Sequence, residues 1–190
     1  MSKTADTEAQ LLEPIATRWS PRAFAEREPT TAELAQIFEA ARWAASSYNA
    51  QPWRFIVTRK SGDARYADAV AGLNEFNRAW GGRAPVIGFC LAAREFDNGK
   101  PNPHAWFDTG AAMAQLGVQA ASIGLMIHQL AGIEREVVRE RFAVPEALEV
   151  VAGFVMGWPG DPAGLPDKLR ERELAARARK PLSELLLHGW

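Results

Sequence analysis

The segment that most constrains the fold is the apolar run from Pro85 to Ala93, which contains no charged residue. It is far shorter than the roughly 18–20 residues that a membrane-spanning helix needs. Its length and composition are typical of a β-strand, and a strand without polar alternation is buried on both faces. We therefore expect residues 85–93 to be central in a sheet.

Shorter patterns predict the other elements. Further strands are expected at residues 53–59, 125–129 and 149–156, and helices at 8–17, 32–44, 62–79, 104–124, 134–141 and 167–178. Thr31 is the expected N-cap of the helix at 32–44, whose apolar residues recur at helical spacing. Strands and helices are interspersed, with connections of unequal length. The chain is therefore predicted to be an α+β protein with a mixed central sheet.

The helix expected at 104–124 has a stripe of small residues, which are Gly110, Ala114, Gly117, Ala121 and Gly124. Small residues at this spacing allow another helix to approach closely. That helix could belong to the same chain or to a second subunit, and the pattern leaves both interpretations open. The apolar tail at 181–187 is also expected to dock on another surface.

Length and charge limit the function classes. The chain has 190 residues, which suits one domain spanning 1–190 but not a cofactor domain plus a substrate domain. A large cofactor would need another arrangement, for instance a site shared between subunits. The net charge of −1 argues against a nucleic-acid or membrane binder. The polar N-terminus has no signal-like apolar core, so a cytoplasmic protein is expected.

Metal and thiol chemistry are not expected. Cys90 is the only cysteine, which excludes an intrachain disulfide and a four-cysteine zinc site. Its place within the apolar run indicates a buried structural thiol. His104 and Asp108 lie four residues apart and could pair on a helix, but no third ligand is near. We therefore predict no metal site.

Two basic clusters are candidates for phosphate binding. Arg18 and Arg22 flank Ser20, and Arg177, Arg179 and Lys180 lie near the C-terminus. The planar guanidinium group suits phosphate because it donates paired hydrogen bonds. Each cluster alone is most often solvated surface. Brought together by the fold, the two could neutralise one phosphate monoester.

The polar segment Ser46-Ser-Tyr-Asn-Ala-Gln51 is a further candidate. Asn and Gln side chains both donate and accept hydrogen bonds, which suits the edge of a heterocyclic ring. The alternative is a turn that simply ends the preceding helix.

Taken in order, these segments resemble the flavin-dependent nitroreductase family. The resemblance covers nearly the whole chain, and its most specific part is the Ser-Ser-x-Asn-x-Gln-Pro-Trp string. The matching motifs are Arg18-x-Ser20-x-Arg22-x-Phe24, Ala44–Phe55, Phe76-Asn77, Ala84-Pro85, His104-x-x-x-Asp108-x-Gly110, Gly124–Gly132, Gly157–Gly160 and Arg177-x-Arg179-x-Pro181-Leu182.

The resemblance implies an intertwined homodimer with two FMN sites at its interface. It assigns the FMN phosphate to Arg18, Ser20, Arg177 and Arg179. Arg22 is implied to lie near the N1–O2 side of the pyrimidine or the ribityl chain, and Asn77 at the pyrimidine edge. The backbone of Trp19 is expected near FMN, with its ring packed on the surface nearby.

Two further segments complete the implied flavin site. One subunit is expected to reach its partner's flavin through Ser46, Ser47 and Asn49, with Gln51 close by. The ring is expected to lie along Gln129, Leu130, Ala131 and Gly132, with the backbone N–H groups of the last two near flavin N5.

The family resemblance also implies an activity. The flavin would take a hydride from NAD(P)H and then reduce a nitroaromatic, a quinone or an activated carbonyl in a ping-pong reaction. Because a flavin carries the chemistry itself, no catalytic side chain is assigned. Ala131 stands where better-known members have an acidic residue. The helix that covers the site in larger members is missing or reduced to residues 76–83. The substrate pocket is therefore expected to differ from theirs. The alternatives are a specialised flavin enzyme, such as a reductive dehalogenase or a flavin-cleaving enzyme, or a non-catalytic flavin-binding protein.

Overall fold

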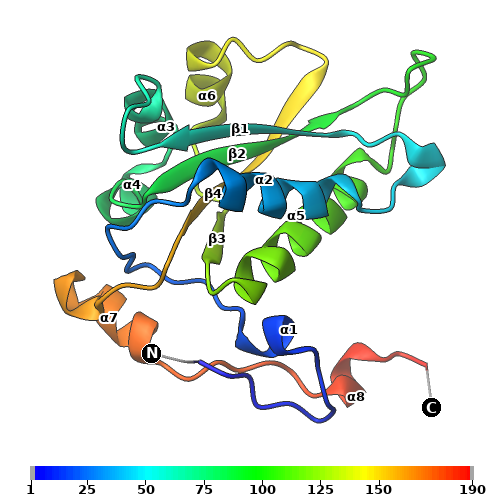
Figure 1. Cartoon of the computed structure of the whole chain (residues 1–190). Helices are drawn as coiled ribbons and strands as arrows, with labels where there is room; N and C mark the ends of the chain where they lie inside the picture. The colour runs from blue at the N-terminus through cyan, green and yellow to red at the C-terminus, as the bar shows by residue number, and fades with distance from the viewer. Residues whose placement is uncertain (1–2, 189–190) are drawn as a thin grey trace.

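The protein has an α+β fold built on a four-stranded sheet. Figure 1 shows the computed structural model, which describes residues 3–188. The strands are β1 (Trp53–Arg59), β2 (Val86–Ala93), β3 (Met126–Leu130) and β4 (Leu148–Gly157), in the order β1-β2-β4-β3. The predicted strands at 53–59, 85–93, 125–129 and 149–156 are therefore confirmed to within one residue at each end.

The sheet is antiparallel rather than mixed. Every neighbouring pair within the described residues is antiparallel. Strands β2 and β3 run in the same direction and are joined by helix α5 (Ala105–Ser122), but β4 lies between them in the opposite direction. The order of the strands removes the parallel pair, and connection lengths alone could not reveal that order.

The helices differ from their predicted bounds mainly at the ends. Helix α2 (Thr31–Arg42) is capped by Thr30, not Thr31, in a capping box with Glu33. The helix predicted at 62–79 is two helices, α3 (Tyr66–Ala71) and α4 (Glu75–Gly81), because Asn74 caps the second by accepting from the backbone of Asn77. The remaining helices are α1 (Glu13–Thr17), α6 (Arg135–Arg141), α7 (Asp167–Leu174) and α8 (Leu182–Leu185), with 3-10 turns η1 (Ser47–Asn49) and η2 (Pro162–Gly164).

The core lies on both faces of the sheet. Helices α2 and α5 cover one face, while α3, α4 and α6 lie on the other side (Figure 1). Side chains of β2 alternate between these layers: Ile87 and Phe89 join one core cluster, and Val86 and Cys90 join the other. This placement confirms that the apolar run is a central strand. Burial raises the pKa of the Cys90 thiol to about 11, which fits a structural thiol.

The small-residue stripe of α5 has two environments. Gly117 and Ala121 are buried, and Arg18 lies against Gly117. Gly110 and Ala114, nearer the start of the helix, are exposed, with no atom within 4 Å of the position that a Gly110 side chain would take. Gly124 lies beyond the end of α5 and is also exposed, so two of the five stripe residues serve packing within the chain and three remain open. None of the helices among residues 3–188 is long and apolar enough to cross a membrane.

Candidate functional site

The fold brings both ends of the chain together around a basic cavity of about 210 Å³. We call it the cation cavity, and its lining residues come from the segments after α1 and around the end of α7. They are Lys3, Arg18, Trp19, Ser20, Arg22, Arg172, Ala175, Ala176, Arg177 and Arg179. The two predicted arginine clusters thus meet in space. Lys180 lies outside this lining and pairs with Glu184 at 3.4 Å.

The cations of this cavity repel one another. Burial lowers the pKa of Arg18, and the charge of Arg179 lowers it further. Burial also lowers the pKa of Arg177, with added repulsion from Arg18 and Arg179. The pKa of Lys3 is lowered by burial and by the charges of Arg22 and Arg177, although Glu173 opposes this shift. A bound anion with several acceptor oxygens would relieve this repulsion.

Glu173 fixes the shape of the cavity. This carboxylate is only 2% exposed and accepts hydrogen bonds from the backbone N–H groups of Arg22, at 2.9 and 3.0 Å, and Ala23, at 3.0 Å. It also lies 3.8 Å from the Arg22 guanidinium. One buried acid therefore holds the segment that carries the first arginine cluster. No sequence pattern indicates this role, because Glu173 lies in a helix crowded with charged residues.

Arg22 lies between Glu173 and Trp80. Its guanidinium carbon is 5.7 Å from the centre of the Trp80 ring. The Arg22 Nε atom is buried and has no hydrogen-bond partner within the described residues. A donor without a partner beside a cationic cavity is a fitting contact for a ligand acceptor group.

His128 supports the same segment from β3. Its Nδ1 lies 2.9 Å from the carbonyl oxygen of Pro21 and must donate a proton to it. The His128 ring packs 4.7 Å from the ring of Trp80. Burial lowers the pKa of His128 to about 4, so the ring is neutral at pH 7. His128 was among the histidines of the sequence but carried no assigned role.

Trp19 is placed differently from the expectation. Its ring is not on the surface: the residue is 8% exposed and clusters with Ala121 and Met126. The small side chain of Ala121 leaves space for the indole on α5. The ammonium group of Lys3 lies 4.8 Å above that ring.

Asn77 and Gly132 are direct neighbours. The Asn77 side-chain amide donates to the carbonyl oxygen of Gly132 at 2.9 Å, and the backbone N–H of Asn74 donates to the same oxygen at 3.2 Å. A Cβ at position 132 would come within 2.7 Å of the Asn77 amide nitrogen, so only glycine fits this close approach. Two predicted flavin contacts are therefore brought together.

The segment before Gly132 presents different surfaces. Gln129 and Ala131 are exposed, whereas Leu130 is 3% exposed and packs in the core. Leu130 can therefore meet a ligand only through its backbone.

The polar segment at 46–51 has a strained backbone. Three of its residues other than glycine adopt left-handed conformations, with φ of 51° at Tyr48, 54° at Asn49 and 46° at Gln51. The backbone N–H of Ser47 donates to the Asp108 carboxylate at 3.0 Å, and that of Gln51 donates to Ser46 Oγ at 3.0 Å. Asp108 thus holds this loop, which is a different role from the His104 pairing considered above. Strain of this kind is concentrated at functional sites.

Within one chain this loop lies apart from the cation cavity. Ser47 is bonded to Asp108 near the start of α5, while Arg18 lies against Gly117 nine residues later. Nine residues of helix span about 14 Å. Figure 1 shows the loop before β1 and the region of α1 at different ends of α5. The loop and the cation cavity of one chain therefore lie near positions of α5 that are about 14 Å apart.

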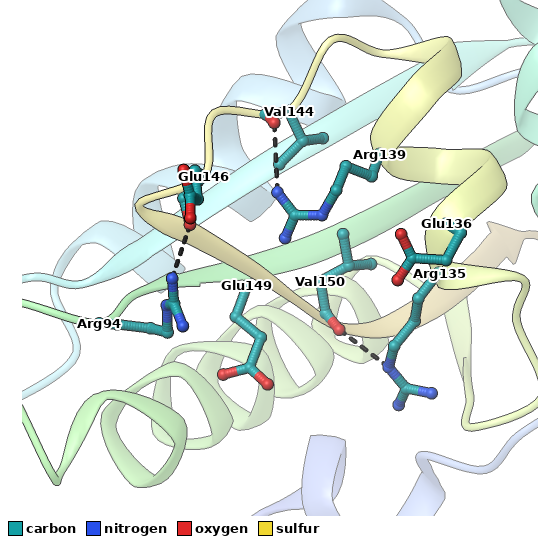
Figure 2. A pocket seen from close by; sticks show the side chains of 8 residues that line it. All are labelled: Arg94, Arg135, Glu136, Arg139, Val144, Glu146, Glu149 and Val150. Carbon is teal, nitrogen blue, oxygen red and sulfur yellow. Dashed lines mark hydrogen bonds between the residues drawn. The ribbon is translucent and has the colours of Figure 1, made fainter.

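A second charged pocket is a structural feature. It has a volume of about 390 Å³, and its arginines bind backbone carbonyl groups: Arg94 bonds Glu146, Arg135 bonds Val150, and Arg139 bonds Val144 and Leu148. Figure 2 shows these side chains directed at the connection between α6 and β4 and at the start of β4. Its arginines therefore hold a loop in place, and we do not assign it a ligand. No cluster of three metal-ligating side chains occurs among residues 3–188.

The fold and cavity define an α+β protein equipped to hold a phosphate-bearing ligand. The chain belongs to the nitroreductase family, whose model matches residues 15–158. A 15.4 kDa protein from the region 5′ of ask in Mycolicibacterium smegmatis is 32% identical over 143 residues, which cover 72% of this chain and 95% of the relative.

Solved structures agree with this family. One is an FMN-containing oxidoreductase that is 33% identical, with a TM-score of 0.92. The match covers 100% of this chain and 97% of the oxidoreductase chain. A nitroreductase-type protein from Desulfovibrio desulfuricans, solved in complex with FMN, is 26% identical, with a TM-score of 0.75, and covers 96% of this chain and 98% of its own.

Proposed function

We propose that this protein is an FMN-dependent oxidoreductase that accepts a hydride from NAD(P)H and reduces a small acceptor. The observation that carries the proposal is the cation cavity, whose lining brings Arg18, Arg177 and Arg179 together; burial lowers the pKa of both Arg18 and Arg177, and the charge of Arg179 lowers both further. That arrangement suits the phosphate of FMN, and the similar oxidoreductase that contains FMN supports the same cofactor.

The residues present fit the cofactor from end to end. Arg18, Arg177 and Arg179, with the Ser20 hydroxyl, would hold the phosphate, and Arg22 would offer its unpartnered Nε to a carbonyl or hydroxyl oxygen. The backbone of residues 129–132 and the Asn77 side chain would border the ring. When bound, FMN supplies a reversible hydride acceptor; the chain supplies orientation and positive charge. For this reason no side chain is given a catalytic role.

We propose that two chains share each site. The loop at 46–51 lies away from the cavity of its own chain, so Ser46, Ser47 and Asn49 would meet the flavin of the other subunit, with Gln51 close by. A large apolar surface is available for association. Exposed apolar side chains occur on α1, α5 and α8, namely Leu12, Ile15, Phe107, Leu182 and Leu185.

The acceptors that we propose are nitroaromatics, quinones and activated carbonyls, reduced after the oxidised nicotinamide leaves the same pocket. A cytoplasmic location stays a prediction from the sequence.

The test begins with the flavin. Purified protein incubated with FMN and desalted should retain a flavin spectrum with about one FMN per chain. R18A should lose most of the bound FMN, whereas R170A, which removes an arginine paired with Asp167 on the surface of α7, should retain it. A wild-type preparation that binds no FMN would refute the proposal.

The second step measures turnover. The loaded protein should oxidise NADH or NADPH when a nitroaromatic, a quinone or an enal is supplied. Bound FMN that passes electrons to none of these acceptors would point instead to a specialised flavin enzyme or a non-catalytic flavin-binding protein.

A further inference from the structure

A groove of about 500 Å³ lies between α4 and α7, outside the cation cavity. Its lining is mostly apolar and includes Phe76, Ala79 and Leu169, while its charged members are Glu75, Lys168 and Arg172. Phe76 is 53% exposed, so its ring is accessible to another molecule.

Two cations of the groove have no charged partner. Lys168 and Arg172 are four residues apart on α7, so they lie on the same face of that helix. Both are exposed, and neither makes an ion pair with another described residue. By contrast, Arg170 on the same helix pairs with Asp167 at 2.8 Å. Glu75 is the single acidic residue of the groove lining, so its net charge is positive.

The groove adjoins both ends of the proposed flavin site. Arg172 lines the groove and the cation cavity together. Phe76 precedes Asn77, whose amide holds the Gly132 carbonyl oxygen at the proposed ring position. The groove lining therefore shares one residue with the proposed phosphate end of the flavin site and borders Asn77 at its proposed ring end.

We propose that this groove binds the adenosine end of the hydride donor, and that Lys168 and Arg172 recognise the 2′-phosphate that distinguishes NADPH from NADH. The inference rests on the proposed function. The phosphate of FMN would already be held by Arg18, Arg177 and Arg179, so a second phosphate would bind Lys168, outside the cation cavity, and Arg172, at its border with the groove. Arg172 offers the planar fork that suits a phosphate, and Phe76 offers an aromatic face to the adenine.

Fragment binding tests the groove without turnover. Calorimetric titration of the FMN-loaded protein should show adenosine 2′,5′-bisphosphate binding about tenfold more tightly than 5′-ADP, the effect of one charge-assisted hydrogen bond. R172A and K168A should each remove most of this difference. R170A is the matched control and should keep it, while E75Q should enlarge it by removing a repulsive charge.

Several results would overturn the inference. These are equal affinity for the two fragments in the wild type, a preference that survives in both R172A and K168A, or release of FMN by the bisphosphate, which would place the ligand in the cation cavity.

Turnover provides an independent readout. The ratio of kcat/KM for NADPH to that for NADH should fall about tenfold in K168A, whose side chain lies outside the cation cavity, with kcat for NADH unchanged. An equal loss for both dinucleotides would contradict phosphate recognition. If the wild type took up no FMN, the proposed function would fail at that earlier step. The fragment titration, repeated with inorganic phosphate filling the cation cavity, would still decide whether the groove binds the bisphosphate.

Discussion

Protonation of His128 should destabilise the fold as the pH falls from about 6.5 to about 4. The ring packs on Trp80, its Nδ1–H group binds the Pro21 carbonyl oxygen, and the charge of Arg22 opposes a second proton. Burial is the main cause that lowers the pKa of His128 from the ordinary value of 6.5 to about 4; the charge of Arg22 lowers it further, while the hydrogen bond to Pro21 opposes the shift. The unfolded chain therefore takes up the proton at a higher pH than the folded chain. The stability is fully present above pH 6.5 and is lost as the pH falls toward 4.

The difference of about 2.5 pKa units corresponds to roughly 3 kcal/mol of unfolding free energy at most. Urea unfolding at pH 7 and pH 4.5, at one protein concentration, measures most of this change. H128N keeps a donor near the position of Nδ1 but cannot be protonated. Its urea midpoint should therefore fall by about 1 M less than that of the wild type.

The control is H104N, which removes an exposed histidine and should lose as much stability as the wild type over this range. Carboxylate protonation below pH 5 affects all three proteins equally and cancels in the comparison. If H128N and the wild type lost the same stability, His128 would carry no protonation penalty in the folded chain, and the reasoning from its burial would be wrong.

Three other substitutions test the packing and the site. E173Q leaves two backbone donors with a weaker acceptor and should lower the unfolding free energy by about 1–3 kcal/mol, whereas E171Q, an exposed neighbour on α7, should have little effect. A thermal shift of the same size in both variants would argue against a special role for Glu173. G88A should lower the unfolding free energy by about 1–3 kcal/mol, because its Cβ would meet the Phe154 ring and lie 2.5 Å from the Ile56 carbonyl oxygen. G110A is the comparison, because its Cβ would meet no atom within 4 Å. Equal stability of the two variants to urea would contradict this packing. F107E places a charge on the exposed start of α5 and should shift sedimentation toward the single-chain mass, with loss of bound FMN; a flavin-loaded wild-type monomer would refute the shared site.

The sequence predicted the strands well because their burial is set by local composition. Residues 86–93 are buried on both sides of the sheet, so the run needs no polar alternation. Strand direction was beyond the same reasoning, since β4 enters between β2 and β3 from a later part of the chain. The break between α3 and α4 had a local signal, the Asn74 cap, which the helical pattern on either side concealed.

At the candidate site, residue chemistry predicted the phosphate-binding arginines, but it did not predict the residues that hold their segment in place. Two clusters about 155 residues apart in the sequence meet because the N- and C-terminal segments run together, as in the hydrogen bonds from Arg177 to the carbonyl oxygens of Lys3 and Ala16. Glu173 and His128 act through backbone groups of Pro21, Arg22 and Ala23. Such contacts depend on the folded path of the chain, which no spacing rule encodes.

The strained loop carries the strongest argument for a second chain in the site. Left-handed conformations at Tyr48, Asn49 and Gln51 cost on the order of 1–3 kcal/mol each, and none of these residues is glycine. The packing of Tyr48 does little to offset that cost, because the residue is 93% exposed and its ring makes an edge contact with Phe96. Asp108 nevertheless holds the loop by the Ser47 backbone, at the end of α5 where Gly110 and Phe107 are open. A loop kept in a costly shape beside an uncovered apolar helix face is explained when both meet another subunit. The same contact would bring Ser46, Ser47 and Asn49 to the flavin of that subunit, whereas in its own chain the loop lies toward the opposite end of α5 from the cation cavity.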